Sequence, residues 1–118
     1  ARRFLHYHPS LVKKGCVFMF RHIVLYKLKG APDDIARHAE EMKQRFDSMP
    51  SHISVIRSLE CGIDTLRSAR SFDISLVMTF DSKEDFLAYK AHPYHQNHVA
   101  AFVHFVIDAS VSTDYDMG

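Results

Sequence analysis

The 118-residue chain has no tryptophan, only two cysteines, and four residues each of glycine and proline. Cys16 and Cys61 are too few for a disulfide scaffold and do not form a CxxC pair, so the composition fits a reducing compartment. No apolar run approaches the roughly 20 residues that span a bilayer, and no GxGxxG motif or phosphate-binding glycine loop is present. These absences predict a cytoplasmic protein with no membrane association and no cofactor.

Acidic residues are missing from residues 1–18, which carry four basic side chains, whereas the rest of the chain carries eleven basic and fourteen acidic ones. A slightly acidic body lacks the concentrated basic face that nucleic-acid binding needs, so no nucleic-acid partner is expected. Residues 1–18 are interpreted as a basic N-terminal extension, either a flexible or non-native tail or an acid-poor targeting segment. Residues 19–116 are predicted to form the domain, with Met19 as a candidate internal start.

The composition is otherwise that of one globular domain. Hydrophobic residues make up 47% of the chain, charged residues 25%, and the net charge is only +1, which excludes disorder as the main state. A chain of this length buries roughly two-thirds of its unfolded surface, enough for one core. The unusual count is histidine, with nine residues.

Hydrophobic periodicity predicts the order of the strands and helices. The expected order is strand 18–28, helix 32–49, strands 53–62 and 72–80, helix 82–92, helical segment 94–106 and strand 109–115. Such an order is that of the ferredoxin-like β-α-β-β-α-β fold, an α+β plan with an antiparallel four-stranded sheet and helices on one face.

Two details of this sheet follow from the same patterns. Strand 53–62 is expected to alternate regularly, which places Arg57, Leu59 and Cys61 on the face opposite Ile56. Helices on one face leave the other face of the sheet bare, and here that face is rich in apolar residues. Because an exposed apolar patch usually marks an interface, we expect a homodimer in which two sheets cover each other.

Two segments carry a family resemblance. FRHIVLYKLK at residues 20–29 and YKAHPYHQNH at residues 89–98, with the strand and helix leading to the latter, resemble the signatures of the stress-responsive α/β-barrel (Dabb) domain family. The resemblance covers residues 19–116. It implies a ferredoxin-like protomer that forms a dimeric α+β barrel, and it implies no single activity, because the family includes plant stress-induced proteins and a polyketide cyclase.

The cyclase subgroup implies three candidate catalytic residues. The subgroup's histidine in the first strand matches His22. Its tyrosine before an HPxH element, here residues 92–95, matches Tyr89, and the second histidine of that element matches His95. A further histidine of that subgroup falls at about Ile74, so this sequence departs from the pattern. The departure puts the specific cyclase reaction in doubt.

The residue types themselves allow proton-transfer chemistry. A histidine titrates near neutral pH and can act as a base, and a tyrosine hydroxyl can orient it or donate to a developing enolate oxygen. Ligand pockets are mostly apolar with a few polar groups. The expected ligand-binding residues are Phe20, Tyr26, Phe86, His92 and Phe102, with Phe105 as a further wall residue.

Three functions remain open. The first is a stress-responsive α/β-barrel domain protein of unassigned activity that binds a small apolar or aromatic molecule near His22, Tyr89 and His95. The second is a cofactor-independent enzyme, a polyketide-cyclase-like aldol or proton-transfer catalyst. The third is a structural dimer module in which these side chains only pack.

A metal site is the weakest interpretation. His95 and His98 are three residues apart, with His92 nearby, and such histidines can share an ion if further ligands are present. The chain has no HExxH motif, and no cysteine lies near this segment. Chance clustering in a histidine-rich chain explains the pattern better, so no metal is expected.

Overall fold

The computed structural model describes residues 18–118. The predicted extension lies outside the described residues, apart from Phe18. The elements are β1 (Phe20–Leu28), α2 (Pro32–Ser48), a 3-10 turn (Met49–Ser51), β2 (Ile56–Ile63), β3 (Ile74–Phe80), α3 (Lys83–Ala91), the π-helical η3 (Tyr94–Ala100), α4 (Ala101–Val106) and β4 (Ile107–Asp116).

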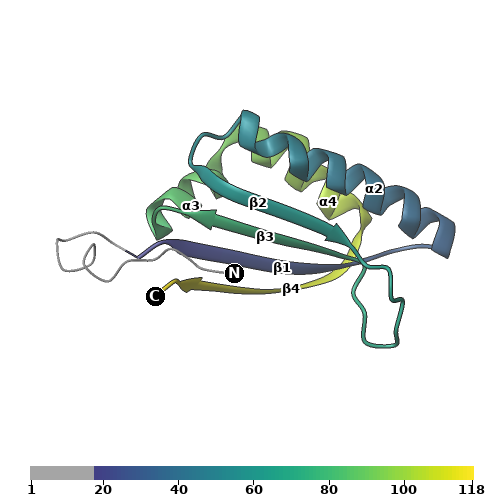
Figure 1. Ribbon diagram of the computed structural model, residues 1–118. Coiled ribbons are helices and arrows are strands. Elements are labelled where there is room, and N and C mark those ends of the chain that lie inside the picture. The colour runs from purple at the N-terminus through teal and green to yellow at the C-terminus, as the bar shows by residue number, and fades with distance from the viewer. Residues whose placement is uncertain (1–17) are drawn as a thin grey trace.

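The four strands form one antiparallel sheet in the order β2-β3-β1-β4. The helices of residues 18–118 all lie on one side of this sheet, with α2 running above β2 and β3 (Figure 1). The ferredoxin-like α+β prediction is therefore confirmed. No helix in residues 18–118 is both long enough and apolar enough to cross a membrane.

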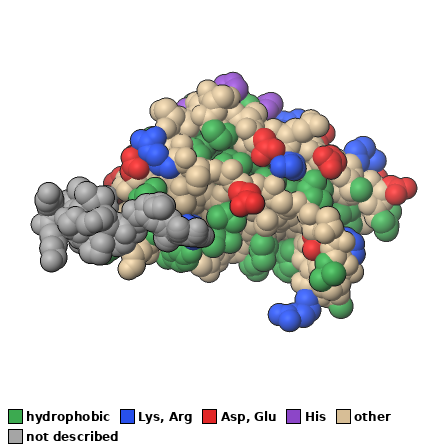
Figure 2. Space-filling view, viewed as in Figure 1, with side chains coloured by type: hydrophobic (Ala, Val, Ile, Leu, Met, Phe, Trp, Pro, Cys, Tyr) green, Lys and Arg blue, Asp and Glu red, His purple; other side chains and the backbone are tan. Residues whose placement is uncertain are grey.

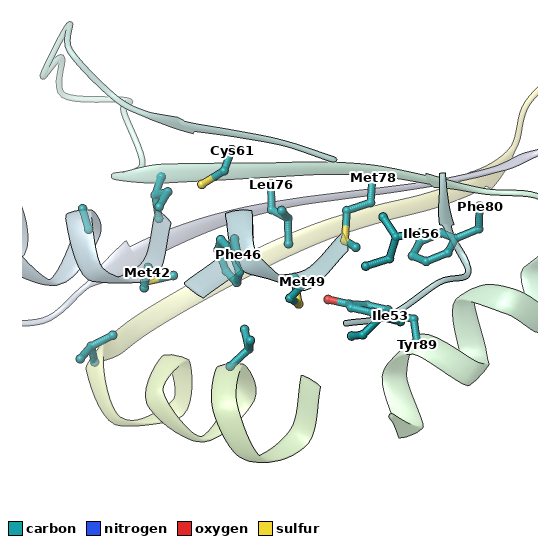
Figure 3. Packing of buried hydrophobic residues seen from close by; sticks show 14 of the residues in the cluster. Met42, Phe46, Met49, Ile53, Ile56, Cys61, Leu76, Met78, Phe80 and Tyr89 are labelled. Atoms are coloured by element: carbon teal, nitrogen blue, oxygen red, sulfur yellow. The ribbon is translucent and has the colours of Figure 1, made fainter. Parts of the chain in front are cut away.

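The core lies between the sheet and the helices. Alternate side chains of β1 and β3 point to this side, and α2 presents its apolar stripe to them because its apolar residues recur at steps of three and four. Figure 3 shows how these layers interdigitate. The fully buried side chains include Met42, Phe46, Met49, Ile53, Ile74, Leu76, Met78, Phe80, Tyr89, Val99 and Val106.

The regular alternation predicted for strand 53–62 is wrong. Ile56 pairs with Phe80, while the next pair along β3 joins Ser58 to Thr79, so Arg57 is an extra residue in β2. Such a bulge reverses the parity of the strand. Ile56 and Cys61 are consequently both buried in the core, although simple alternation places them on opposite faces.

The last helical segment differs from a single α-helix. Residues 94–100 form a π-helix, and only residues 101–106 are α-helical before the chain enters β4. Wide π-turns occur often at functional sites because they shift the side chains that follow out of the α-helical register. Here the π-helix includes His95 and His98.

Among residues 18–118, no helix packs on the face of the sheet away from α2, α3 and α4. Leu25 of β1 and Val111 and Tyr115 of β4 are exposed on it, at 38%, 51% and 39% respectively. Hydrophobic side chains gather along the lower margin of Figure 2, on the side of the sheet opposite the helices. We call this surface the open face.

Candidate functional site

A cavity of about 320 Å³ lies between strands β1 and β4 and the segment from α3 to α4. His22, Tyr89 and His95, the three candidate catalytic residues, all line it. The sheet and the helices supply both apolar and polar side chains to its lining. The other lining residues are Val24, Tyr26, Phe46, Lys90, Val99, Ala100, Val103, His104, Ile107, Ser110 and Ser112.

His22 is held by a carboxylate on the neighbouring strand. It lies on the helix-facing side of β1, and the antiparallel register places Asp114 of β4 directly opposite. His22 Nδ1 and the Asp114 carboxylate form a hydrogen bond, in which Nδ1–H donates to Oδ1. This bond fixes the ring and leaves Nε2 as its proton acceptor.

Burial and charge act in opposite directions on His22. Its side chain is almost wholly buried, and burial lowers its pKa because the charged imidazolium loses hydration. The hydrogen bond and negative charge of Asp114 oppose this change, while the Lys90 ammonium adds to it. The net direction is down, so His22 is a neutral base at neutral pH.

Tyr89 comes from the last turn of α3. That helix is capped by Ser82, whose hydroxyl accepts a hydrogen bond from the Asp85 amide at 3.1 Å. The Tyr89 ring lies 4.4 Å from the His95 ring and 6.3 Å from the His22 ring, measured between centroids. Burial raises the Tyr89 pKa, so the phenol remains protonated and is a hydrogen-bond donor.

His95 is oriented by the backbone of the preceding helix. Its Nδ1 donates to the Lys90 carbonyl at 3.2 Å, and Gln96 Nε2 donates to the same oxygen at 2.9 Å. These contacts fix the start of η3 against the end of α3. Burial lowers the pKa of His95, with the carbonyl bond opposing that change and the Lys90 charge adding to it. His95 is therefore a second neutral imidazole beside the cavity.

Of the expected ligand-binding residues, Tyr26 lines the cavity. Phe20 and Phe86 do not line it. They pack together with ring centroids 5.2 Å apart, and Phe86 lies 4.8 Å from the His22 ring. Phe86 therefore packs against the His22 ring, and Phe20 packs against Phe86.

His92, Phe102 and Phe105 lie elsewhere. His92 Nδ1 accepts a hydrogen bond from the Tyr94 amide at 3.0 Å, which is a turn contact at the end of α3. Phe102 lies under the Arg45 guanidinium, 4.6 Å from ring centroid to Cζ. Phe105 is 75% exposed and forms no wall.

Several polar groups at this site were not among the predicted ones. Asp114, Lys90 and His104 are not among the candidate residues of the sequence. His104 is exposed and also lines the cavity. The available signal was the alternation of Ser110, Ser112 and Asp114 along the final strand, because a polar strand face turned toward helices requires a wet or ligand-filled space.

The three neighbouring histidines do not make a metal centre. Within residues 18–118, no group of three or more His, Cys, Asp or Glu side chains is placed to hold one ion. His92 and His95 both use Nδ1 for backbone hydrogen bonds, at 3.0 and 3.2 Å. His98 instead packs on Tyr94, with ring centroids 4.7 Å apart.

Comparisons with known proteins agree with the fold. Residues 20–117 match the model of the Stress responsive A/B Barrel Domain. A stress-response A/B barrel domain-containing protein of Arabidopsis thaliana is 32% identical over 101 residues, which are 81% of this chain and 84% of that protein.

Two solved structures are similar in three dimensions. A dimeric ferredoxin-like protein of unknown function from Bacteroides fragilis has a TM-score of 0.77 and 27% identity, covering 84% of this chain and 96% of that one. Another dimeric ferredoxin-like protein of unknown function, from Thermobifida fusca, has a TM-score of 0.72 and 22% identity, covering 86% and 92%.

Proposed function

Since this chain belongs to the stress-responsive A/B barrel domain family, we propose that it binds a small apolar or aromatic molecule in the cavity beside His22, Tyr89 and His95. The observation that carries the proposal is the cavity itself, about 320 Å³ in volume. This is at the lower end of the usual range for small-molecule sites. A structural module whose side chains only pack has no need of such a space.

The lining suits a molecule with an apolar body and one polar end. Val24, Phe46, Val99 and Val103 supply apolar surface, and the tyrosine and histidine groups supply few, fixed hydrogen bonds. Fixed polar groups in an apolar pocket orient a ligand and select it. A phenol or an aryl ketone has this combination.

We further propose that the working form is a homodimer joined through the open face. Leu25, Val111 and Tyr115 would otherwise leave apolar surface in water on this face. Two ferredoxin-like structures similar to this chain are described as dimeric. A two-fold pairing of sheets removes this surface from water in both copies at once.

Binding is tested by isothermal titration calorimetry of the protein with a series of 4-alkylphenols. We expect saturable binding by the wild type and at least tenfold weaker binding by Ser112→Phe, which places a bulky side chain at a lining position of the cavity. Ala36→Phe on the exposed face of α2 is the matched control and should bind as the wild type does. Equal affinities in Ser112→Phe and the wild type would place the ligand elsewhere.

A cofactor-independent proton-transfer enzyme is the second candidate, favoured by the His22–Asp114 pair. In that reaction Nε2 of His22 takes the α-proton of a bound ketone, and the Tyr89 hydroxyl donates a hydrogen bond to the enolate oxygen. The position of the cyclase subgroup's fourth histidine is occupied by Ile74, buried in the core, so the cyclase reaction itself is not proposed.

Catalysis is tested by using NMR to monitor the exchange of the α-protons of an aryl ketone for deuterium in D2O. We expect the wild type to accelerate the exchange, and His22→Asn and Tyr89→Phe to lose most of the acceleration. Binding of the ketone without any acceleration would leave the protein a ligand binder.

A further inference from the structure

The connection between β2 and β3, residues 64–73, projects from the sheet on the side away from the helices (Figure 1). We call it the β2–β3 loop. The Leu66 side chain in this loop is 79% exposed, the highest value for any large hydrophobic residue within residues 18–118. A single exposed leucine is ordinary on a protein surface, but this loop is held in a fixed position by polar contacts at its base.

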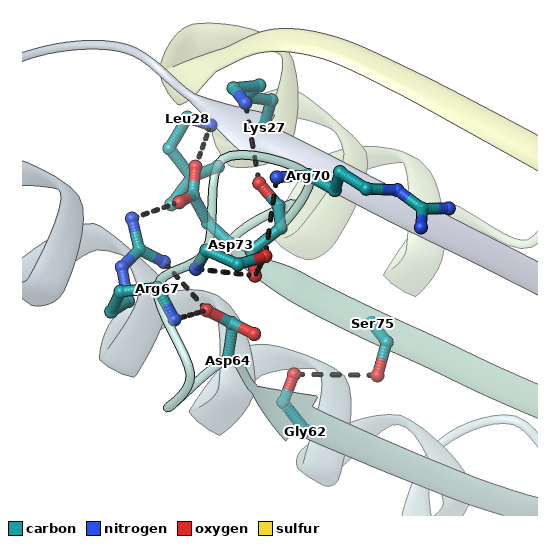
Figure 4. A network of polar contacts seen from close by, with 10 residues as sticks. Lys27, Leu28, Gly62, Asp64, Arg67, Arg70, Asp73 and Ser75 are labelled. Carbon is teal, nitrogen blue, oxygen red and sulfur yellow. Dashed lines mark hydrogen bonds and ion pairs between the residues drawn. The ribbon is translucent and has the colours of Figure 1, made fainter.

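A buried carboxylate holds the base of the loop. The Asp73 side chain is 4% exposed and accepts hydrogen bonds from the Leu28 amide at 2.7 Å and from Arg67 Nη2 at 2.8 Å (Figure 4). The Asp73 amide donates to the Tyr26 carbonyl at 2.8 Å. These bonds attach the loop to β1, the central part of the sheet, rather than only to its own strands.

Further contacts hold the remainder of the loop. Asp64 Oδ2 accepts from the Arg67 amide at 2.8 Å, and the Ser68 and Ser71 hydroxyls are hydrogen-bonded at 2.9 Å. Arg67 has φ of 56°, a left-handed conformation that a residue with a side chain adopts at a cost. Arg67 is held in this conformation by Asp64 and by the buried Asp73 carboxylate, and a strained residue held in this way is typical of a segment whose shape matters for function.

The loop borders a hollow on the open face. This hollow has a volume of about 500 Å³ and is lined by Leu25 and Ser75 of the sheet and by Arg70 and Phe72 of the loop, among others. Leu25 belongs to the open face as well. The hollow is therefore continuous with the surface that the homodimer would bury, and Leu66 directly follows Thr65, one of its lining residues.

We propose that the β2–β3 loop holds the second copy of this chain, with Leu66 of each protomer packing against the open face of the other. This inference rests on the homodimer proposed above and adds a specific contact to it. In a two-fold dimer each contact is made twice, so one exposed leucine per chain supplies two apolar contacts at opposite ends of the interface. The rigid loop loses little conformational freedom on association, which favours binding.

The test compares two exposed leucines by sedimentation equilibrium across a range of protein concentrations. Leu66→Ser should raise the dimer dissociation constant at least tenfold. Leu87→Ser is the matched control, because Leu87 is 53% exposed on α3, in the helical layer, and it should leave the constant unchanged. Circular dichroism establishes that both variants are folded.

The possible results separate the two proposals. A wild type that remains monomeric at high micromolar concentration overturns the homodimer and the loop contact together. A dimeric wild type with an unchanged dissociation constant in Leu66→Ser overturns only the loop contact. Equal weakening by Leu66→Ser and Leu87→Ser also overturns it, because the effect would not be specific to the loop.

Discussion

Replacing Asp73 with alanine should destabilise the domain by about 3 kcal/mol. Its carboxylate accepts from the buried Leu28 amide and from Arg67, at 2.7 and 2.8 Å. A hydrogen bond to a charged group contributes about 1.5–3 kcal/mol, and a buried donor left without an acceptor costs about 1–3 kcal/mol. Arg67 is 52% exposed, so its bond is partly screened and lies at the lower end of that range.

Asp73→Asn separates the two bonds. The amide oxygen of asparagine still accepts from the Leu28 amide, whereas the charge that attracts Arg67 is lost. We expect this variant to lose about half as much stability as Asp73→Ala. Asp33→Ala, at an exposed position in the first turn of α2, is the control and should change the free energy of unfolding by less than about 0.5 kcal/mol.

The measurement is urea unfolding at one fixed protomer concentration, because dimerisation would add to the apparent stability. Hydrogen exchange gives a local readout, since the Leu28 amide should exchange much faster in Asp73→Ala. A free energy of unfolding for Asp73→Ala within about 1 kcal/mol of the wild-type value would refute this prediction. Equal free energies of unfolding for the asparagine and alanine variants would also refute it.

Three other measurements test the site and the interface. Burial lowers the pKa of His22 and His95 below the ordinary value of 6.5. The unfolded chain therefore binds more protons than the folded one, and stability falls as pH drops below about 6.5. His22→Asn should flatten this pH dependence in urea unfolding experiments between pH 7 and 5, and an unchanged slope would contradict the prediction. Tyr89→Phe should weaken binding of 4-alkylphenols about two- to tenfold by calorimetry, the loss of one hydrogen bond, and unchanged affinity would remove the hydroxyl from the site. Leu25→Lys on the open face should yield a monomer in sedimentation, and a persistent dimer would place the interface elsewhere.

The three candidate catalytic positions came from two short segments about 70 residues apart in the chain. The structure brings them to one cavity because β1 is central in the sheet and α3 and η3 pack over it. That they share a cavity is a structural finding, and their role in binding or catalysis remains the proposal. The phenylalanines expected in the pocket wall do not line the cavity. An aromatic residue close to the site in sequence can instead lie in the core, as Phe20 does, or on the surface, as Phe105 does.

Asp114 illustrates a residue that local pattern cannot assign. Its alternation with Ser110 and Ser112 shows a polar strand face, but the pattern does not say which layer that face meets. Only the pairing of β4 with β1 puts its carboxylate opposite His22. The bulge at Arg57 is of the same kind, because one extra residue in β2 is defined only by its pairing with β3.

The sequence by itself determined the order of the elements, the antiparallel α+β plan and the apolar residues of α2, β1 and β3, because periodicity and turn residues act over a few neighbouring positions. Tertiary structure decided the strand register, the His22–Asp114 pair, the π-helical start of the last helical segment and the attachment of the β2–β3 loop to β1. Each of these depends on contacts between residues distant in the chain, whose energies are set by packing and burial, and no local pattern records them.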